Sequence, residues 1–286
     1  MEGALVRKAT AEDRKEVLSF CVGTFDWGDY IDEVYDFWLG APDSLFLVAE
    51  TAGKPVGIVH ARQMRHGVAW LEGLRVSPAH RREGVGTALT AKAMEMLSEG
   101  GIKTLRLLVE SNNEASMALA FGLGFREEAT WAFYHGRKPR EMPSHGPHWV
   151  TPASASNVWS RLDSSDLFNQ ACRSYENDWA IYPLESDDFS ELVKGRMVAT
   201  MGEGKEAALA VVHYGRTEGR DAKACFLLGD RPAVKELAAF VISKAARSGA
   251  RRLHVSCPNH AGTTEGLKAS GFRPGFRTSL VYRRNL

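Results

Sequence analysis

Apolar and polar residues alternate along the first part of the chain in short runs that glycine-containing turns separate. Residues 45–50, 54–61 and 67–76 have the alternation of β-strands. Residues 10–20 and 85–99 have the spacing of helices, and the first of these opens on a residue that caps helices well. The pattern predicts a helix, an antiparallel meander of three strands and a second helix, in that order.

The next residues continue this alternation of strands and helices. Residues 104–109 are apolar on both faces, which is typical of a central strand covered on both sides. A capped helix follows over 112–121 and ends at Gly124-Phe125. We expect a strand over 129–136 to close this part of the fold.

The second half repeats the first in outline. Residues 233–247 read as a helix, 251–256 as a strand and 259–270 as a helix that closes on Gly271-Phe272. Before it, prolines and polar residues mark a linker; the prolines are Pro139, Pro143, Pro147 and Pro152. We therefore expect three segments: a domain over 1–140, a linker over 141–156 and a second domain over 157–286.

A basic glycine loop joins the strand that ends at Val76 to the helix that begins near Val85. Gly84 and Gly86 let the backbone approach an anion closely, and the amides at the start of the helix point toward it with the positive end of the helix dipole. Two arginines before the glycines add positive charge. The loop predicts a phosphate site, although paired glycines in such a turn also serve only to relieve backbone strain.

Two motifs carry a resemblance to a known family. The run Arg81-Arg82-Glu83-Gly84-Val85-Gly86 resembles the Arg/Gln-x-x-Gly-x-Gly/Ala signature of the GNAT superfamily of acetyl-CoA-dependent N-acetyltransferases. Asn113 and Ser116, followed by a helix and Gly124-Phe125, match its second signature. The resemblance implies an α/β fold with a mixed sheet, and together with the internal repeat it implies two tandem GNAT-like domains.

The resemblance also implies which residues hold acetyl-CoA as cosubstrate. The amides of the loop would hold the pyrophosphate, the strand edge before it would pair with the pantetheine arm and face the thioester oxygen, and the second motif would contact the other side of that arm. These residues are Leu74, Arg75, Val76, Arg81, Arg82, Glu83, Gly84, Val85, Gly86, Thr87, Asn113 and Ser116.

Two side chains are candidates for proton transfer. Glu72 lies at the strand position where a number of GNAT enzymes carry their base, and its parity with Trp70 indicates a covered face; the alternative is an ordinary strand glutamate in solvent. The chain departs from the family at Ala120, where many members have a tyrosine that protonates the leaving thiolate. Tyr134 is a possible substitute, although an aromatic residue there is more often core or pocket lining.

The acceptor pocket is expected after the first helix. Asp26, Trp27 and Asp29 combine acids with an aromatic ring, which suits a cationic amine. Residues 31–38 have the apolar spacing of an amphipathic helix, so its acids are better explained as solvated. Residues 29–42, with Glu72 to Val76, loosely resemble the histidine N-acetyltransferase branch of the family.

The second half lacks the glycine loop. Leu228 to Val234 stand at the corresponding place, where Pro232 removes an amide and no glycine pair occurs. We therefore expect a degenerate second copy that does not bind CoA.

Composition restricts the remaining possibilities. A formal net charge of +1 over 286 residues argues against a nucleic-acid or acidic-membrane partner. The beginning of the chain has no apolar signal region, so a cytoplasmic location is expected. The four cysteines and the isolated histidines lack the spacing of a metal site, so we expect no metal, buried free thiols and no role for the histidines.

These observations favour a cytoplasmic N-acetyltransferase that moves an acetyl group from acetyl-CoA to a primary amine of a small molecule such as an amino acid, as a monomer or homodimer. Two alternatives stay open. One is a non-catalytic regulator that binds acyl-CoA, which Ala120 makes plausible. The other is a protein N-terminal acetyltransferase.

Overall fold

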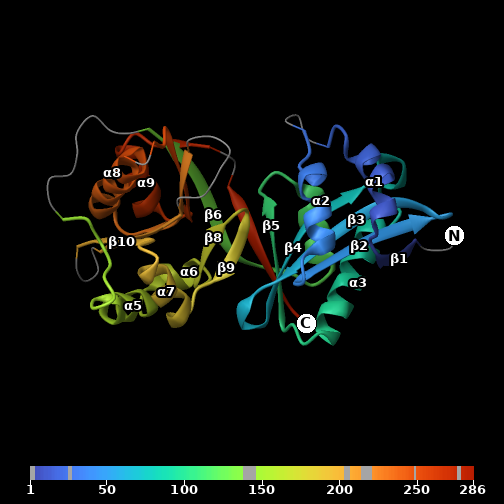
Figure 1. Ribbon diagram of the computed structural model, residues 1–286, viewed down its shortest axis with the longest axis horizontal. Coiled ribbons are helices and arrows are strands. Elements are labelled where there is room, and N and C mark those ends of the chain that lie inside the picture. The colour runs from blue at the N-terminus through green and yellow to red at the C-terminus, as the bar shows by residue number, and fades with distance from the viewer. Residues whose placement is uncertain are drawn as a thin grey trace. The chain divides into compact units, whose positions relative to one another are not determined.

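The computed structural model describes residues 4–24, 28–137, 146–202, 207–213, 221–247, 249–275 and 278–286. The chain forms two compact units (Figure 1). The first consists of Met1–Leu108, Asn113–Arg126 and Tyr282–Leu286, and the second of Val109–Asn112 and Glu127–Val281. Each unit therefore contains residues from early and late parts of the sequence.

The first unit is built on five successive strands in the order β1-β2-β3-β4-β5. Neighbours are antiparallel from β1 to β4, whereas β4 and β5 are parallel. The strands are β1 (Leu5–Lys8), β2 (Ser44–Thr51), β3 (Lys54–Gln63), β4 (Val68–Val76) and β5 (Thr104–Glu110). The helices are α1 (Arg14–Cys21), α2 (Ile31–Gly40), α3 (Val85–Glu99) and α4 (Glu114–Gly122), with short 3-10 turns at Ala11–Asp13, Arg65–Gly67 and Pro78–His80.

Helices cover both faces of this sheet. Alternate residues of β2 and β3, among them Phe46 and Ile58, pack with the apolar sides of α1 and α2. On the other face, Gly57 of β3 lies directly under Val85 and Leu89 of α3. The predicted helices and meander are confirmed, because the sheet is buried between two helical layers as the pattern of apolar residues requires.

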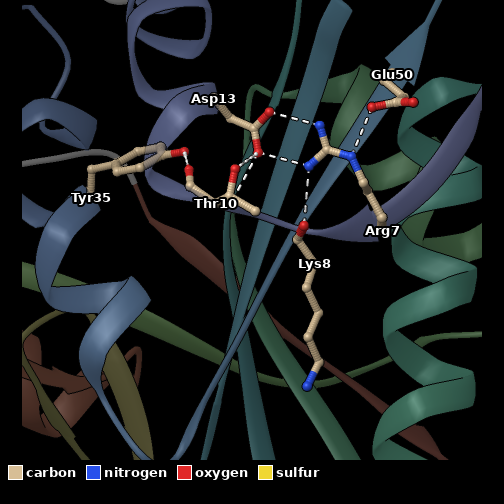
Figure 2. Close-up of polar contacts among 6 residues, drawn as sticks. All are labelled: Arg7, Lys8, Thr10, Asp13, Tyr35 and Glu50. Carbon is tan, nitrogen blue, oxygen red and sulfur yellow. Dashed lines mark hydrogen bonds and ion pairs between the residues drawn. The ribbon is translucent and has the colours of Figure 1, made fainter. Parts of the chain in front are cut away.

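An ion-pair network fixes the start of this unit (Figure 2). The Arg7 guanidinium on β1 donates to both carboxylate oxygens of Asp13 at 2.7 Å and to Glu50 on β2 at 2.7 Å. Asp13 also accepts the Thr10 amide at 2.8 Å, and the Tyr35 hydroxyl of α2 donates to the Thr10 carbonyl. The hydrogen bond from Arg7 holds the pKa of the Asp13 carboxyl below its usual value.

In the second unit the strands follow the order β6-β13-β12-β11-β10-β7 in the sheet. Its strands are β6 (Arg126–Gly136), β7 (His148–Trp149), β10 (Val198–Met201), β11 (Ala208–His213), β12 (Asp221–Leu228) and β13 (Arg252–Pro258), with β14 (Arg273–Pro274) also on β6 and a separate hairpin of β8 (Ser174–Asn177) and β9 (Ala180–Pro183). Its helices are α5 (Ala155–Asp163), α6 (Asp166–Gln170), α7 (Ser186–Lys194), α8 (Arg231–Arg247) and α9 (Ala261–Ala269).

This sheet also has an apolar layer on each face. Leu227 of β12 packs in the core formed with α8 and α9, whereas the side chain of the preceding residue, Phe226, lies edge-on to Phe168 of α6. The centroids of these two rings are 6.2 Å apart. Because β12 and β13 are parallel and each is followed by a helix, the second unit repeats the plan of β4, α3, β5 and α4. The repeat expected from the sequence is confirmed in the order of these strands and helices.

The expected role of the strand near 129–136 is wrong in one respect. The strand forms, but β6 pairs with β13 and β14 of the second unit, with Tyr134 opposite Val255. The strand that follows β5 in the sheet order is β15 (Ser279–Asn285), the last of the chain, and the Leu286 amide donates to the Lys103 carbonyl. The segment expected as a linker, 141–156, includes β7 and the first residues of α5.

Several general expectations can be compared with the described residues. The four cysteines are buried and free, as expected. Within the described ranges, no group of three or more metal-ligating side chains occurs, and no helix is long and apolar enough to cross a membrane. The cytoplasmic location stays a prediction.

Candidate active site

The loop between β4 and α3 places a helix start at an open surface. Gly84 is the residue before the helix and has a left-handed backbone, φ 82°, which favours glycine. A Cβ at Gly84 would meet no atom within 4 Å. The first turn of α3 has no acidic residue, and the first amides of a helix lack acceptors within the helix. The loop therefore presents positive helix charge to an accessible surface, as an anion site requires.

The two glycines of this loop have different structural roles. A Cβ at Gly86 would lie 3.0 Å from the Leu119 side chain of α4, so glycine lets α4 pack close to the start of α3. The side chains of Arg81, Arg82, Glu83 and Thr87 are exposed, and Val85 is buried beneath them. The structure thus brings the predicted phosphate-binding residues together in one loop and one helical turn.

The strands before this loop diverge. The ladder between β4 and β5 ends at Leu71 opposite Leu107, although β4 continues to Val76 and β5 to Glu110. On the other side of β4 the register with β3 shifts, because Ile58 faces Arg75 while His60 faces Glu72. Two residues of β4 therefore oppose one of β3, which is a β-bulge. Leu74, Arg75 and Val76 lie beyond the point where β4 and β5 stop pairing.

A tryptophan packs against the bulge. Gly73 has a φ of 67°, and a Cβ there would lie 2.8 Å from Cζ3 of Trp38 on α2. Glycine is thus required both by its backbone and by the ring above it. The bulge consequently sets the direction in which the preceding side chain, Glu72, extends from the strand.

Glu72 takes part in a polar chain that crosses β2, β3 and β4. His60 Nδ1 lies 3.0 Å from Glu72 Oε1, and His60 Nε2 lies 2.8 Å from Ser44 Oγ. Ser44 Oγ also donates to the Trp38 carbonyl at 2.5 Å. The His60 ring stacks on the Trp38 ring with centroids 4.1 Å apart. Its side chain is 2% exposed and that of Glu72 is 17% exposed, so the glutamate is held on one side and reaches solvent on the other.

The second predicted motif forms the start of α4. Asn113 is the residue before the helix, and its side chain accepts the Ser116 amide at 3.1 Å. The Asn113 side chain thus caps α4, and Ser116 lies half-buried in its first turn. Their contact with a pantetheine arm stays a prediction.

Comparison with known proteins agrees with this geometry. Residues 11–125 match the acetyltransferase (GNAT) family. This segment is a GNAT domain. The chain is 34% identical over 143 residues to the acetyl transferase GW6a of Oryza sativa subsp. japonica, covering 43% of this chain and 34% of that protein. It is 33% identical over 107 residues to the mycothiol acetyltransferase of Clavibacter sepedonicus, covering 37% of this chain and 34% of that protein. It is 28% identical over 102 residues to the histidine N-acetyltransferase of Xenopus tropicalis, covering 35% of this chain and 32% of that protein.

Several solved structures match nearly the whole chain. Among them, a tandem GNAT protein from the clavulanic acid biosynthesis pathway aligns with a TM-score of 0.55 and 14% identity over 99% of this chain and 98% of that chain. The two-copy GNAT architecture predicted from the sequence is therefore confirmed. The chain spans about a third of the length of the three curated relatives.

The acidic region expected to bind the acceptor is only partly described. Asp26 and Trp27 lie outside the described residues. Asp29 accepts the Arg75 guanidinium through both oxygens, at 2.8 and 3.1 Å, and also accepts the Ile31 amide at the start of α2. Its carboxylate thus joins the GNAT strand β4 to α2, and its contact with an acceptor stays a prediction.

The other proton-transfer candidate lies in the second unit. Tyr134 is a buried residue of β6, in the apolar core with α8 and α9. Burial raises the pKa of its hydroxyl, so the group is a neutral donor near neutral pH. The structure places Glu72 in the GNAT domain and Tyr134 in the other unit, and Ala120 is buried where many GNAT enzymes have a tyrosine. A role for Tyr134 in transfer stays a prediction.

In the second unit, α9 contacts the backbone of the loop that corresponds to the glycine loop of the first unit. Thr263 Oγ1 of α9 donates to the Gly229 carbonyl at 3.0 Å and accepts the Gly229 amide at 3.4 Å. A Cβ at Gly266 of α9 would lie 2.7 Å from Val234, so α9 and α8 pack very closely. This arrangement supports the prediction that the second copy does not bind CoA.

His60, to which the sequence pattern gave no role, is the hydrogen-bond partner of the candidate base Glu72 in the structure. The β3–β4 hairpin carries a signal, because pairs counted outward from a turn centred on His66 place residue 60 opposite residue 72. This signal can be used only if the centre of the turn is known, and the residues from 62 to 66 do not define that centre in the sequence.

Proposed function

We propose that this protein transfers the acetyl group of acetyl-CoA to a primary amine of a small molecule, such as an amino acid, through its GNAT domain. The observation that carries the proposal is the open, left-handed Gly84 at the start of α3, beside strands β4 and β5 that stop pairing at Leu71. These features fit a pyrophosphate at the loop and an extended pantetheine arm along β4.

The chemistry divides between backbone and side chain. The amine nitrogen attacks the thioester carbonyl carbon after losing a proton, and the carbon–sulfur bond breaks to release the CoA thiolate. Backbone amides of β4 near Leu74 would stabilise the negative charge that develops on the carbonyl oxygen. Glu72, which reaches solvent beside that strand segment, would accept the proton of the substrate ammonium. Solvent would protonate the departing thiolate.

The remaining assignments are part of the same proposal. The first unit, to which most of residues 1–140 belong, is the catalytic domain, and the second unit, to which residues 141–156 and most of 157–286 belong, is a degenerate copy without a CoA site. Asp26, Trp27 and Asp29 are proposed to bind the acceptor as a cation. The names of the mycothiol and histidine acetyltransferases support a small-molecule amine.

A substrate screen with matched variants tests the proposal. The chain is incubated with acetyl-CoA and amino acids, polyamines or short peptides, and thiol release and the acetylated product are measured. Glu72→Gln should bind acetyl-CoA as the wild type does but lower kcat/KM by roughly 10²-fold to 10⁴-fold, the scale for losing a general base. Glu99→Gln, the same change at an exposed position of α3, is the control.

The outcomes separate the alternatives. Binding of acetyl-CoA without turnover of any amine would support the regulator, which the buried alanine at position 120 favours. Acetylation of peptide N-termini but of no free amino acid would support a protein N-terminal acetyltransferase. Full activity of Glu72→Gln would assign the base elsewhere.

A further inference from the structure

His60 has an acceptor facing each of its ring nitrogens. A carbonyl oxygen carries no hydrogen, so the single hydroxyl hydrogen of Ser44 goes to the Trp38 carbonyl, 2.5 Å away. Ser44 Oγ must then accept a hydrogen from His60 Nε2, 2.8 Å away. The contact with Ser44 thereby fixes a hydrogen on Nε2.

The second contact requires one more proton. A neutral imidazole with its hydrogen on Nε2 has a bare lone pair on Nδ1, and this atom lies 3.0 Å from Glu72 Oε1. Two lone pairs would repel each other there, so a proton lies between the two groups. The face of Trp38, stacked at 4.1 Å, favours the cationic form of His60, and the solvent-reaching edge of Glu72 favours the carboxylate.

We infer that His60 is an imidazolium that positions Glu72, a role that rests on the proposed function of Glu72 as base. It holds Oε1, and within the described residues no hydrogen bond uses Oε2, which is left to meet the substrate ammonium. Trp38 links this arrangement to the strand, because the same ring stacks on His60 and fills the space over Gly73. The bulge and the imidazolium together fix the direction of the carboxylate.

Two substitutions separate the two ring contacts. His60→Asn places an amide nitrogen near the position of Nδ1, so it keeps a donor for Glu72. His60→Gln places its amide near the position of Nε2, so it keeps the contact with Ser44 and removes the donor to Glu72. We expect His60→Gln to lower kcat by about 10-fold to 100-fold, the scale for a misplaced catalytic group, with the KM for acetyl-CoA unchanged. His60→Asn should recover most of that loss.

Nitrogen-15 NMR of the ring gives a readout that needs no turnover. We expect both His60 nitrogens to carry hydrogen in the wild type near neutral pH, and only one in Glu72→Gln, whose neutral amide can donate to Nδ1. Melting curves of each variant verify folding, and His148→Gln makes the same change at an exposed histidine.

The results distinguish this inference from the proposed function. If Glu72→Gln is inactive while His60→Gln matches the wild type in kcat, or if wild-type His60 has a single protonated nitrogen, the inference is wrong and the base assignment survives. If Glu72→Gln is fully active, the proposed base is wrong, and a doubly protonated His60 would then still support the contact but not its role.

Discussion

The two units share one strand plan and differ at the loop where a ligand would lie. In each unit a parallel ladder stops early, at Leu71 opposite Leu107 in the first and at Ala224 opposite Val255 in the second. Each also has a register shift on the preceding hairpin. The fold therefore preserves the divergence of the strands in both copies.

The difference arises from a few residues at the start of the following helix. Gly84 faces open space, whereas both backbone polar groups of Gly229 bind Thr263. Pro232 in the first turn of α8 also removes an amide that an anion could use. A copy of the fold thus keeps its sheet when the geometry of this loop changes, because the sheet depends on burial of many apolar residues and the loop on individual amides.

The largest effect is expected from separating the two halves of the sequence. The first unit includes Tyr282–Leu286 and the second includes Glu127–Gly136, so neither half of the chain contains one whole unit. A fragment of residues 1–143 should aggregate or lose acetyl-CoA binding, because β5 lacks its C-terminal neighbour β15 and β6 lacks its partner β13. Size-exclusion chromatography and thermal melts measure this.

A full chain with a protease site inserted at residue 143 is the matched control. After cleavage the two pieces should elute together and keep acetyl-CoA binding, because both units are already assembled. A soluble, fully active fragment of residues 1–143 would contradict this prediction and show that the first half folds by itself.

The next effect concerns the open loop. Gly84→Asp with Gly86→Asp should abolish the stabilisation by acetyl-CoA and weaken its binding by about 100-fold, because one carboxylate replaces the open space at Gly84 and the other adds negative charge to the first turn of α3, close to Leu119. Isothermal calorimetry should report one molecule bound per wild-type chain. Arg231→Asp puts the same charge at the start of α8 and should leave binding unchanged.

Two results would break the comparison between the loops. Unchanged affinity in a folded double glycine variant would remove the first loop from the binding site. A stoichiometry of two per wild-type chain would show that the second loop opens despite Thr263.

Local signals in the sequence predicted the elements, and the pairings between distant segments had to come from the structure. The glycine pair and the apolar spacing gave α3 its observed bounds, Val85–Glu99. An alternating pattern states which face of a strand is buried and not which strand lies beside it, so the partner of β6 was missed. The pairing of Glu72 with His60 depends on the register of β3 with β4, which no single residue specifies.

The smallest effect compares the caps of the two units. Asp13 and Asp188 both accept the amide three residues earlier, at 2.8 and 3.0 Å, and Asp13 also binds Arg7. The pKa of Asp13 is lowered in the folded state, so its contribution is complete above the unfolded value of 3.8 and is lost as the pH falls through the lower folded value. Asp13→Asn should cost about 1 to 3 kcal/mol at pH 7.

Urea unfolding from pH 7 down to about pH 3 measures this dependence. Because wild-type Asp13 must take up a proton on unfolding below its unfolded pKa, the wild type should lose stability faster than Asp13→Asn as the pH falls, and the two curves should converge. Asp188→Asn makes the same change at the matching cap of the second unit and separates the effect of the cap from that of Arg7. Wild-type and Asp13→Asn curves that stay parallel over this range would mean that the ion pair with Arg7 does not stabilise the first unit.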